Sequence, residues 1–214
     1  MLLAALAAWI VQTIPQPAAP AQQRSGGGEL ASVALEVLPV KGRAPKTGYK
    51  RAQFGDGWAK LGDCDTRNLI LQRDLKDAVL ENDKCKVRTG ALSDPYTGKA
   101  IAFARGASTS AAVQIDHVVA LSNAWQTGAQ QLSAERRVQL ANDPLELLAV
   151  DGPANQQKGD GDAATWLPSN KPFRCQYIAR QIAVKRKYAL WVTEPEKAAM
   201  ARVLSSCPEQ IMPA

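Results

Sequence analysis

The spacing of apolar residues divides the chain into segments of helical and of extended character. Apolar residues recur on one helical face between Leu71 and Val79. Asp65-Thr66 before them is a plausible N-cap, so we expect a helix that ends at about Leu80. From Val87 onward the spacing changes and predicts extended chain.

Three extended segments follow in this part of the sequence. The turn sequence Asp94–Gly98 separates two of them, and Ala111–Val119 is a further apolar segment. Asp116-His117 lies near the end of that segment. Leu145–Val150 predicts a short buried strand that ends at Asp151-Gly152.

Helices are expected on both sides of this last strand. The segment Ser133–Leu140 has helical spacing, and Pro153 suits the first turn of a second helix with Asp151-Gly152 as its cap. Asn155 and Lys158, three residues apart, then share one face of that short helix.

The segment Phe173–Trp191 predicts an amphipathic helix with a basic face. Arginines and lysines occupy most of its polar positions. Such a face is either solvated or in contact with the phosphates of a nucleic acid, and the pattern does not decide between the two.

Composition limits the number of domains and the class of partner. A chain of 214 residues that is 46% hydrophobic can form one substantial core and is too short for two domains of usual size. With its mixed helices and strands, it is expected to be a single α+β domain. Its net charge of +6 favours polyanionic partners such as nucleic acid or an acidic envelope polymer.

The N-terminus has features of an export signal. Leu2–Ile14 is apolar and uncharged, and prolines and the small-x-small site Ala19-Pro20-Ala21 follow it, although a basic segment before it is missing. We expect residues 1–21 to be a signal peptide or an N-terminal anchor, so that the protein is secreted, or envelope-associated if uncleaved. Residues 22–48 predict a linker with a docking segment at Leu30–Val40.

Four cysteines form an even set, and none lies in the C-x-x-C spacing of a zinc ribbon. Two disulfides are expected behind an export signal, whereas four buried free thiols are the alternative in a cytosolic protein. Of the three connectivities, we favour Cys64 with Cys85 and Cys175 with Cys207, because each pair brackets one predicted helix.

His117 is the only histidine in the chain, so imidazole chemistry near neutral pH must occur there. A neutral imidazole can accept a proton from an attacking water, although a lone histidine is more often structural. Asp116 could join it in one site only where the strand bends or ends. Asp116 and the amide of Asn155 would supply hard oxygens, which favour one divalent cation, Mg²⁺ first and Mn²⁺ as the alternative.

Three motifs in this order resemble the HNH nuclease pattern, and more closely the GmrSD-type HNH domain of exported actinobacterial proteins. They are Ile115-Asp116-His117, Asn142-Asp143-Pro144-Leu145 and Asn155-x-x-Lys158-Gly159. Further matching stretches are Tyr49-x-Arg51-x-x-Phe54-Gly55, Cys64-Asp65-Thr66-Arg67, Asp94-Pro95-Tyr96-Thr97-Gly98, Ala124-Trp125 and Trp166-Leu167-Pro168. Each stretch alone is weak evidence, but their joint order is specific.

The resemblance implies a ββα-metal core surrounded by helices, in a domain over residues 49–208 with a C-terminal tail at 209–214. In that core His117 is expected to be the general base, and Asp116 with Asn155 the metal ligands. Many relatives carry histidine where this chain has Asn155. This departure disfavours zinc and nickel and strengthens the expectation of oxygen ligands.

Two further residues have roles implied by the same resemblance. Asn142 would tie down the loop between the two strands and so fix the base, although an ordinary loop cap is the alternative. Lys158 would contact phosphate or the developing charge, although a surface lysine with no role is nearly as plausible. Arg67 is open between an ion pair with Asp65 or Asp63 and a phosphate clamp.

The sequence therefore predicts a secreted, metal-dependent HNH endonuclease that hydrolyses phosphodiester bonds in DNA, with RNA as the alternative substrate. It would bind the nucleic-acid backbone mainly by charge. One rival is a secreted basic module that holds DNA or envelope polyanions without cutting them. The other is a structural envelope protein whose HNH core is a relic, although retention of the aspartate, the histidine and both asparagines argues against decay.

Overall fold

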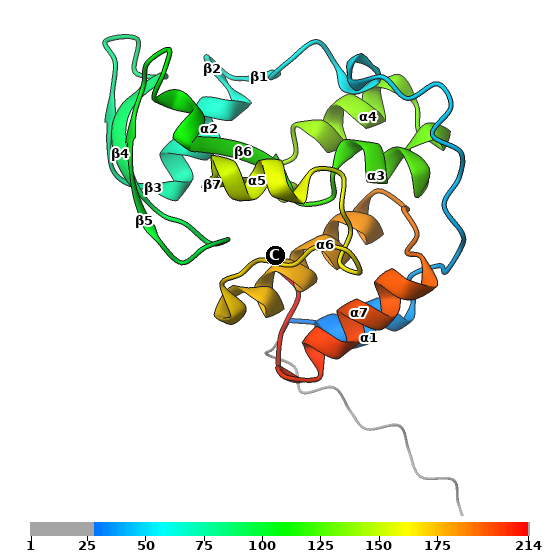
Figure 1. The fold of residues 1–214 in the computed structure, drawn as a ribbon. Helices are drawn as coiled ribbons and strands as arrows, with labels where there is room; N and C mark the ends of the chain where they lie inside the picture. The colour runs from blue at the N-terminus through cyan, green and yellow to red at the C-terminus, as the bar shows by residue number, and fades with distance from the viewer. Residues whose placement is uncertain (1–27, 214) are drawn as a thin grey trace, which may run out of the picture.

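The computed structural model describes residues 28–213, and the expected signal peptide or anchor at 1–21 lies outside these residues. The described part is an α+β domain, as the sequence predicts, with helices around three small antiparallel sheets (Figure 1). No helix within residues 28–213 is long and apolar enough to cross a membrane.

Helices and strands are interspersed along the chain. The α-helices are α1 (Ala31–Glu36), α2 (Thr66–Asp74), α3 (Leu121–Gln126), α4 (Ala134–Ala141), α5 (Gly152–Lys158), α6 (Arg174–Lys187) and α7 (Glu194–Leu204). The strands are β1 (Lys60–Leu61), β2 (Cys64–Asp65), β3 (Leu75–Leu80), β4 (Val87–Ser93), β5 (Ala100–Ala104), β6 (Val113–His117) and β7 (Leu147–Asp151). Short 3-10 helices are η1 (Arg51–Phe54), η2 (Ser110–Ala112), η3 (Ala129–Gln131) and η4 (Lys171–Phe173). The sheets are β1-β2, β3-β4-β5 and β6-β7.

The helix expected to reach Leu80 ends at Asp74, so this prediction is wrong over its last six residues. From Leu75 the chain pairs with β4, in a register that places Leu75 opposite Leu92 and Leu80 opposite Val87. The partner strand β4 begins only at Val87, so the spacing of apolar residues up to Leu80 carries no information about it. Its hydrogen bonds outweigh the weak local preference for helix.

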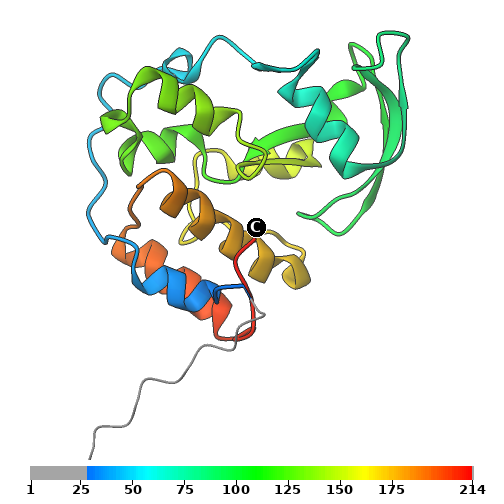
Figure 2. The same ribbon diagram turned by 180° about the vertical axis from the view of Figure 1, so that it is seen from behind.

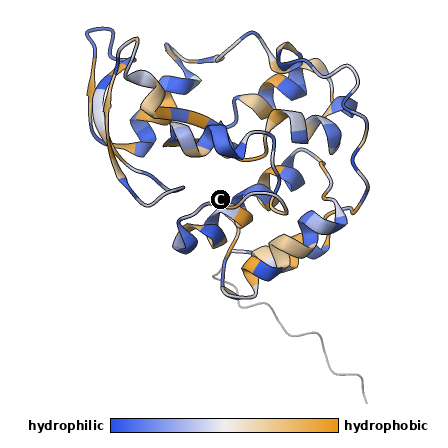
Figure 3. Ribbon diagram, in the orientation of Figure 1, coloured by the Kyte–Doolittle hydropathy of each residue, from blue (hydrophilic) through white to orange (hydrophobic). Residues whose placement is uncertain are grey.

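β6 and β7 are buried strands that separate two hydrophobic clusters. Ile115 and Ala149 belong to the smaller cluster, together with residues of α2 and of the β3-β4-β5 sheet. Leu148 and Val150 belong to the larger cluster, together with residues of α3, α6 and α7. Figure 3 shows hydrophobic colour along much of β6, whereas α5 beside it is largely hydrophilic.

α5 follows β7 directly and lies against β6. Asp151 is its N-cap and accepts a hydrogen bond from the backbone N–H of Ala154 at 2.8 Å, and Pro153 lies in the first turn as expected. A Cβ atom on Gly152 would lie 2.1 Å from the carbonyl oxygen of Ala111, so only glycine allows this close approach. β6 and β7, which are connected through α3, η3 and α4, thus pair side by side, and α5 packs against both strands.

The described part of the expected linker is packed into the domain. α1 contacts α6 and α7, and Figure 2 shows it beside α7. Leu30 forms a β-bridge with Ile211, and Val40 forms one with Val192. The described residues before residue 49 thus pack against the helices of the domain, and Met212, within the expected tail at 209–214, is buried in the core.

Both predicted disulfides are present. Cys64–Cys85 joins β2 to the loop after β3, and Cys175–Cys207 joins the first turn of α6 to the residues after α7. The second disulfide thus brackets two helices, α6 and α7, of which only the first was predicted from the sequence. That helix begins at a capping box formed by Thr193 and Glu196.

The basic face expected on the segment around α6 is largely occupied by partners in the protein. Lys185 is buried and forms an ion pair with Glu196 at 2.9 Å. Arg180 donates to the carbonyl oxygens of Leu145 at 2.6 Å and Pro144 at 2.7 Å. Lys185 and Arg180 therefore stabilise the fold, whereas Arg186 and Lys187 in the last turn are exposed and form ion pairs with Glu29 and Asp143.

Candidate active site

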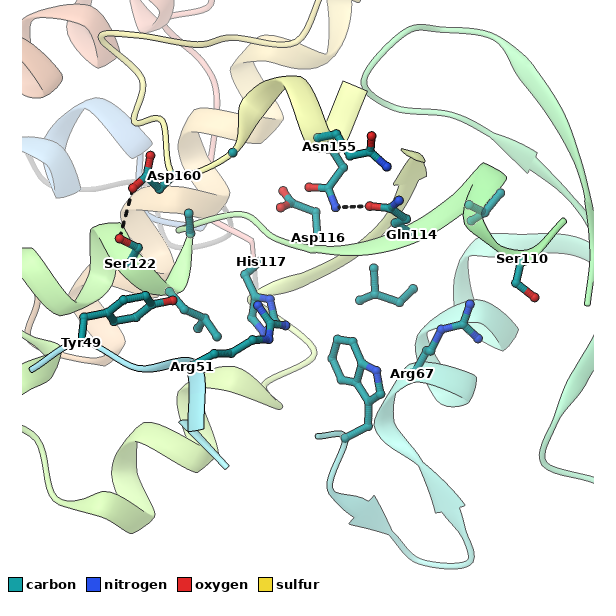
Figure 4. A pocket seen from close by; sticks show the side chains of 17 residues that line it. Tyr49, Arg51, Arg67, Ser110, Gln114, Asp116, His117, Ser122, Asn155 and Asp160 are labelled. Carbon is teal, nitrogen blue, oxygen red and sulfur yellow. Dashed lines mark hydrogen bonds between the residues drawn. The ribbon is translucent and has the colours of Figure 1, made fainter. Parts of the chain in front are cut away.

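A polar pocket of about 550 Å³ opens where α5 and β6 meet α2, the start of α3 and the segment before β1 (Figure 4). Asp116, His117 and Asn155 all line it, as the sequence predicts for residues of one site. The other two candidates, Asn142 and Lys158, do not line the pocket. Lys158 contacts Asp116, which does, and Asn142 bonds Ala59, the residue after the lining residue Trp58.

His117 is the last residue of β6 and is buried. Its Nε2 atom lies 2.9 Å from the carbonyl oxygen of Ala141. A carbonyl only accepts hydrogen bonds, so we assign the proton to Nε2, which leaves Nδ1 as a free acceptor. Burial, with the positive charges of Arg51 and Lys158 in support, lowers the pKa of the imidazole to about 3. The ring is therefore neutral at pH 7.

The backbone around His117 is held at consecutive positions. The ammonium of Lys158 donates to the carbonyl oxygen of His117 at 2.7 Å. Glu146 binds the next two residues, since its carbonyl accepts from Val118 N at 2.9 Å and its Oε2 atom lies 3.2 Å from Val119 N. Burial raises the pKa of the Glu146 carboxyl well above its usual range. The strand end that carries the imidazole is thus rigid.

One face of the imidazole is covered by an aromatic ring that the sequence analysis did not single out. The indole of Trp58 is parallel to the ring of His117, with an interplanar angle of 4° and 5.7 Å between centroids. The backbone N–H of the next residue, Ala59, donates to Oδ1 of Asn142 at 2.8 Å. Asn142 therefore fixes the segment that carries Trp58, and its Nδ2 atom donates to Val138 within the end of α4.

The carboxylate of Asp116 is buried and has a partner on each oxygen. Oδ1 lies 2.9 Å from the ammonium of Lys158, and Oδ2 accepts from the hydroxyl of Tyr96. Burial raises the pKa of the Asp116 carboxyl, whereas Lys158 and Tyr96 oppose that shift. The ammonium of Lys158 is itself buried, so a direct phosphate contact would require it to leave Asp116 and the His117 carbonyl.

Asn155 projects from α5 toward β6. Its Nδ2 atom donates to Oε1 of Gln114 at 3.0 Å, and Figure 4 shows the amide oxygen on the side of Asp116. Asp151, and not Asn155, caps the helix. Asn155 therefore keeps an oxygen that has no hydrogen bond within the described residues.

The donor set fits a hard divalent cation held jointly with water or substrate. Asp116 and Asn155 supply oxygens, and each carboxylate oxygen of Asp116 has a second lone pair beyond its present hydrogen bond. Within residues 28–213 no group of three or more His, Cys, Asp or Glu residues could hold a metal ion. Magnesium sites in which one or two protein ligands are completed by water and phosphate are common.

Arg67 from α2 and Arg51 from η1 bring positive charge into the pocket. The ion pair considered for Arg67 is not formed, because Asp65 instead accepts hydrogen bonds from the backbone and side chain of Asn68. Burial lowers the pKa of the Arg67 guanidinium, and the neighbouring charge of Arg105 adds to this effect. Arg51 belongs to the matching stretch Tyr49-x-Arg51-x-x-Phe54-Gly55, but neither Arg51 nor Trp58 was predicted to be a site residue.

The fold and the pocket together define a disulfide-bonded α+β protein with a polar site built around one neutral imidazole. The chain belongs to the family described as GmrSD restriction endonucleases, C-terminal domain, whose model matches residues 65–203. It is a nuclease family, which agrees with the predicted resemblance. No solved structure matches the chain.

The chain is also similar to an uncharacterized secreted protein of Arthroderma benhamiae. The two sequences are 35% identical over 207 residues, which cover 96% of this chain and 98% of the relative. The predicted secretion is thereby confirmed. This relative is a fungal protein, whereas the resemblance in the sequence was to exported actinobacterial proteins.

Proposed function

We propose that this protein is a secreted HNH-type endonuclease that hydrolyses phosphodiester bonds in DNA, with His117 as the general base. The observation that carries the proposal is the hydrogen bond from Nε2 of His117 to the carbonyl of Ala141, which leaves Nδ1 free within the pocket. DNA is the first substrate to test, because the family is one of restriction endonucleases. RNA is the second.

The chemistry assigned to His117 is the removal of one proton from water. As Nδ1 takes the proton, the water oxygen forms a bond to phosphorus and the bond to the leaving sugar oxygen breaks. The leaving oxygen gains its proton from solvent, and the imidazolium returns its proton to solvent. A bound phosphate would favour this proton transfer, since its negative charge opposes the effect of Arg51 on the imidazole.

Asp116 and Asn155 are proposed to hold one divalent cation, Mg²⁺ or Mn²⁺. When bound, such a cation neutralises the scissile phosphate and stabilises the leaving oxygen. Lys158 opposes the upward shift that burial causes in the pKa of the Asp116 carboxyl, and it fixes the orientation of this side chain through the contact at 2.9 Å. It also holds the carbonyl of His117, so it positions both residues of the motif.

Asn142 is proposed to be a positioning residue for the base. It acts through the hydrogen bond to Ala59, which keeps the indole of Trp58 against the imidazole. The ring of His117 is then confined between this indole and its hydrogen bond to Ala141. A base held in one rotamer loses less entropy when the attacking water is activated.

The proposal is tested with purified disulfide-bonded protein and three substrates: plasmid DNA, single-stranded DNA and RNA. Each is incubated with Mg²⁺ or Mn²⁺, with and without a chelator, beside the His117→Ala variant. We expect metal-dependent cleavage of DNA by the wild type alone. Binding without cleavage under all conditions would instead support a basic module that holds polyanions, and equal cleavage by both proteins would contradict the role proposed for His117.

A further inference from the structure

Two arginines that line the pocket form no ion pair within the described residues. Neither Arg51 nor Arg67 forms an ion pair with any described residue or donates a side-chain hydrogen bond to one. The acids of the same pocket are already engaged. Asp116 binds Lys158 at 2.9 Å, and Asp160 binds Lys46 at 3.0 Å.

Arg67 is placed where an unpaired cation is unfavourable for the fold. Burial lowers the pKa of its guanidinium and Arg105 lowers it further, whereas the charge of Asp65 opposes the shift. It also lies in the first turn of α2, whose N-terminus carries the positive end of the helix dipole. Asp65 offsets only part of these unfavourable effects and forms no ion pair with Arg67, and an anion bound in the pocket would reduce the remaining cost.

The two arginines lie on opposite sides of the reacting residues. Figure 4 shows Arg51 beside His117, near Tyr49, and Arg67 on the far side toward Ser110 and Gln114. The nearness of Arg51 to His117 is also seen in its effect on the pKa of the imidazole. A chain that crosses the pocket from one guanidinium to the other therefore passes close to His117, which lies next to Arg51 (Figure 4).

We propose that Arg51 and Arg67 bind the two phosphates that flank the scissile phosphate on one strand. This inference rests on the proposed function and deepens it, because it defines the recognised unit as three consecutive phosphates. Positively charged grooves that follow a nucleic-acid backbone recognise phosphates without regard to base sequence. The site therefore cuts internal linkages, and it acts poorly on a diester that has no phosphate on either side.

The test uses tetrathymidylate, which has three phosphodiester linkages, and two analogues in which the first or the third linkage is a neutral methylphosphonate. Cleavage of the central linkage is followed for the wild type and for Arg51→Met and Arg67→Met. Arg88→Met is the matched control, because Arg88 is exposed on β4 and does not line the pocket. The same labelled oligonucleotides are titrated against each protein, and binding is measured by fluorescence anisotropy.

In the wild type and in Arg88→Met, each methylphosphonate is expected to lower kcat/KM about tenfold, the effect of losing one charge-assisted hydrogen bond. In Arg51→Met, one of the two methylphosphonates should no longer lower kcat/KM. In Arg67→Met, the other methylphosphonate should no longer lower it. Arg67→Met should also melt at the same temperature as the wild type or higher, because it removes an unpaired cation, whereas a structural arginine would lower the melting temperature.

The outcomes test the inference and the proposed function separately. Cleavage by the wild type with both methylphosphonate effects retained in both arginine variants would overturn the inference and leave the nuclease proposal intact. Binding that shows the arginine-dependent pattern without any cleavage would support the inference and overturn the nuclease proposal. Absence of both binding and cleavage would overturn both.

Discussion

Asn142 accepts a hydrogen bond from the backbone N–H of Ala59 at 2.8 Å, across 83 positions in the sequence. This contact joins the end of α4 to the segment that carries Trp58. It explains how an asparagine that does not line the pocket can affect the base. The expected role of Asn142 in fixing His117 therefore has a specific path, through Trp58, and remains a prediction to be tested.

Asn142→Ala leaves the N–H of Ala59 without its partner and releases the segment that carries Trp58. We expect a loss of about 1 to 3 kcal/mol in the free energy of unfolding. We also expect kcat to fall with little change in KM, because the substitution disturbs the position of the base and leaves the substrate contacts in place. Steady-state kinetics and chemical denaturation measure the two effects. An unchanged kcat in a destabilised variant would mean that Asn142 is only a structural cap.

His117→Ala removes the proposed base and leaves the substrate-binding residues in place. Loss of a general base typically lowers the rate about 10²- to 10⁴-fold. Cleavage of DNA should fall by that factor, whereas circular dichroism and DNA affinity should stay near those of the wild type. A matched variant is Ser122→Ala, which removes a hydroxyl from the same pocket without touching the base. Cleavage by His117→Ala within threefold of the wild type would disprove the role assigned to His117.

Lys158→Met leaves the buried carboxylate of Asp116 without its ammonium partner. Breaking a buried pair from one side costs about 3 to 5 kcal/mol, because the remaining charge is uncompensated. Combination with Asp116→Asn removes that charge and should restore much of the lost stability. Urea denaturation of the wild type, both single variants and the double variant gives the coupling energy. Additive effects would mean that Lys158 does not serve Asp116.

Reduction of the two disulfides should lower stability more than any single surface substitution. Closing loops with sequence separations of 21 and 32 residues contributes about 3 kcal/mol apiece. Mass spectrometry of non-reduced peptides should show Cys64 joined to Cys85 and Cys175 joined to Cys207. Thermal unfolding with and without reductant measures the loss. Mixed pairings in protein that still cleaves DNA would contradict a structural role for these bonds.

The sequence predicted most of what lies within one local segment and less of what depends on distant segments. The short helix after Asp151 was expected from its local cap and proline. The joint position of Asp116, His117 and Asn155 was expected from the family resemblance, because β6 and β7 are separated by α3, η3 and α4. β3 was predicted to be helix, since its partner strand lies outside the local window. α7 was missed, although the capping box that begins it is visible in the sequence.

The residues around the base that were missed come from distant parts of the chain. Trp58 stacks on His117 although 59 positions separate them, and Asn142 bonds the residue after Trp58. Lys185 belongs to a segment predicted to have a basic face, yet it is buried against Glu196 of the unforeseen α7. A charged residue with a partner on an unpredicted element cannot be told from a solvated one by spacing alone.

The last prediction concerns Asn155, whose position in a first helical turn allowed two roles. The structure assigns the cap to Asp151, and the amide nitrogen of Asn155 binds Gln114. The remaining amide oxygen is therefore available to a cation beside Asp116. Asn155→Ala should then raise the Mg²⁺ concentration needed for half-maximal cleavage and lower the rate, with only a small change in melting temperature.

Asn155→His should shift the preference toward Ni²⁺ and Zn²⁺, because an imidazole nitrogen suits these cations better than Mg²⁺. Asp151→Ala is the matched control, since it removes the cap of the same helix and should cost about 1 kcal/mol of stability without altering the metal dependence. Cleavage is titrated with Mg²⁺, Mn²⁺ and Ni²⁺ for all four proteins. Metal curves for the Asn155 variants that superimpose on the wild type would show that Asn155 is not a ligand.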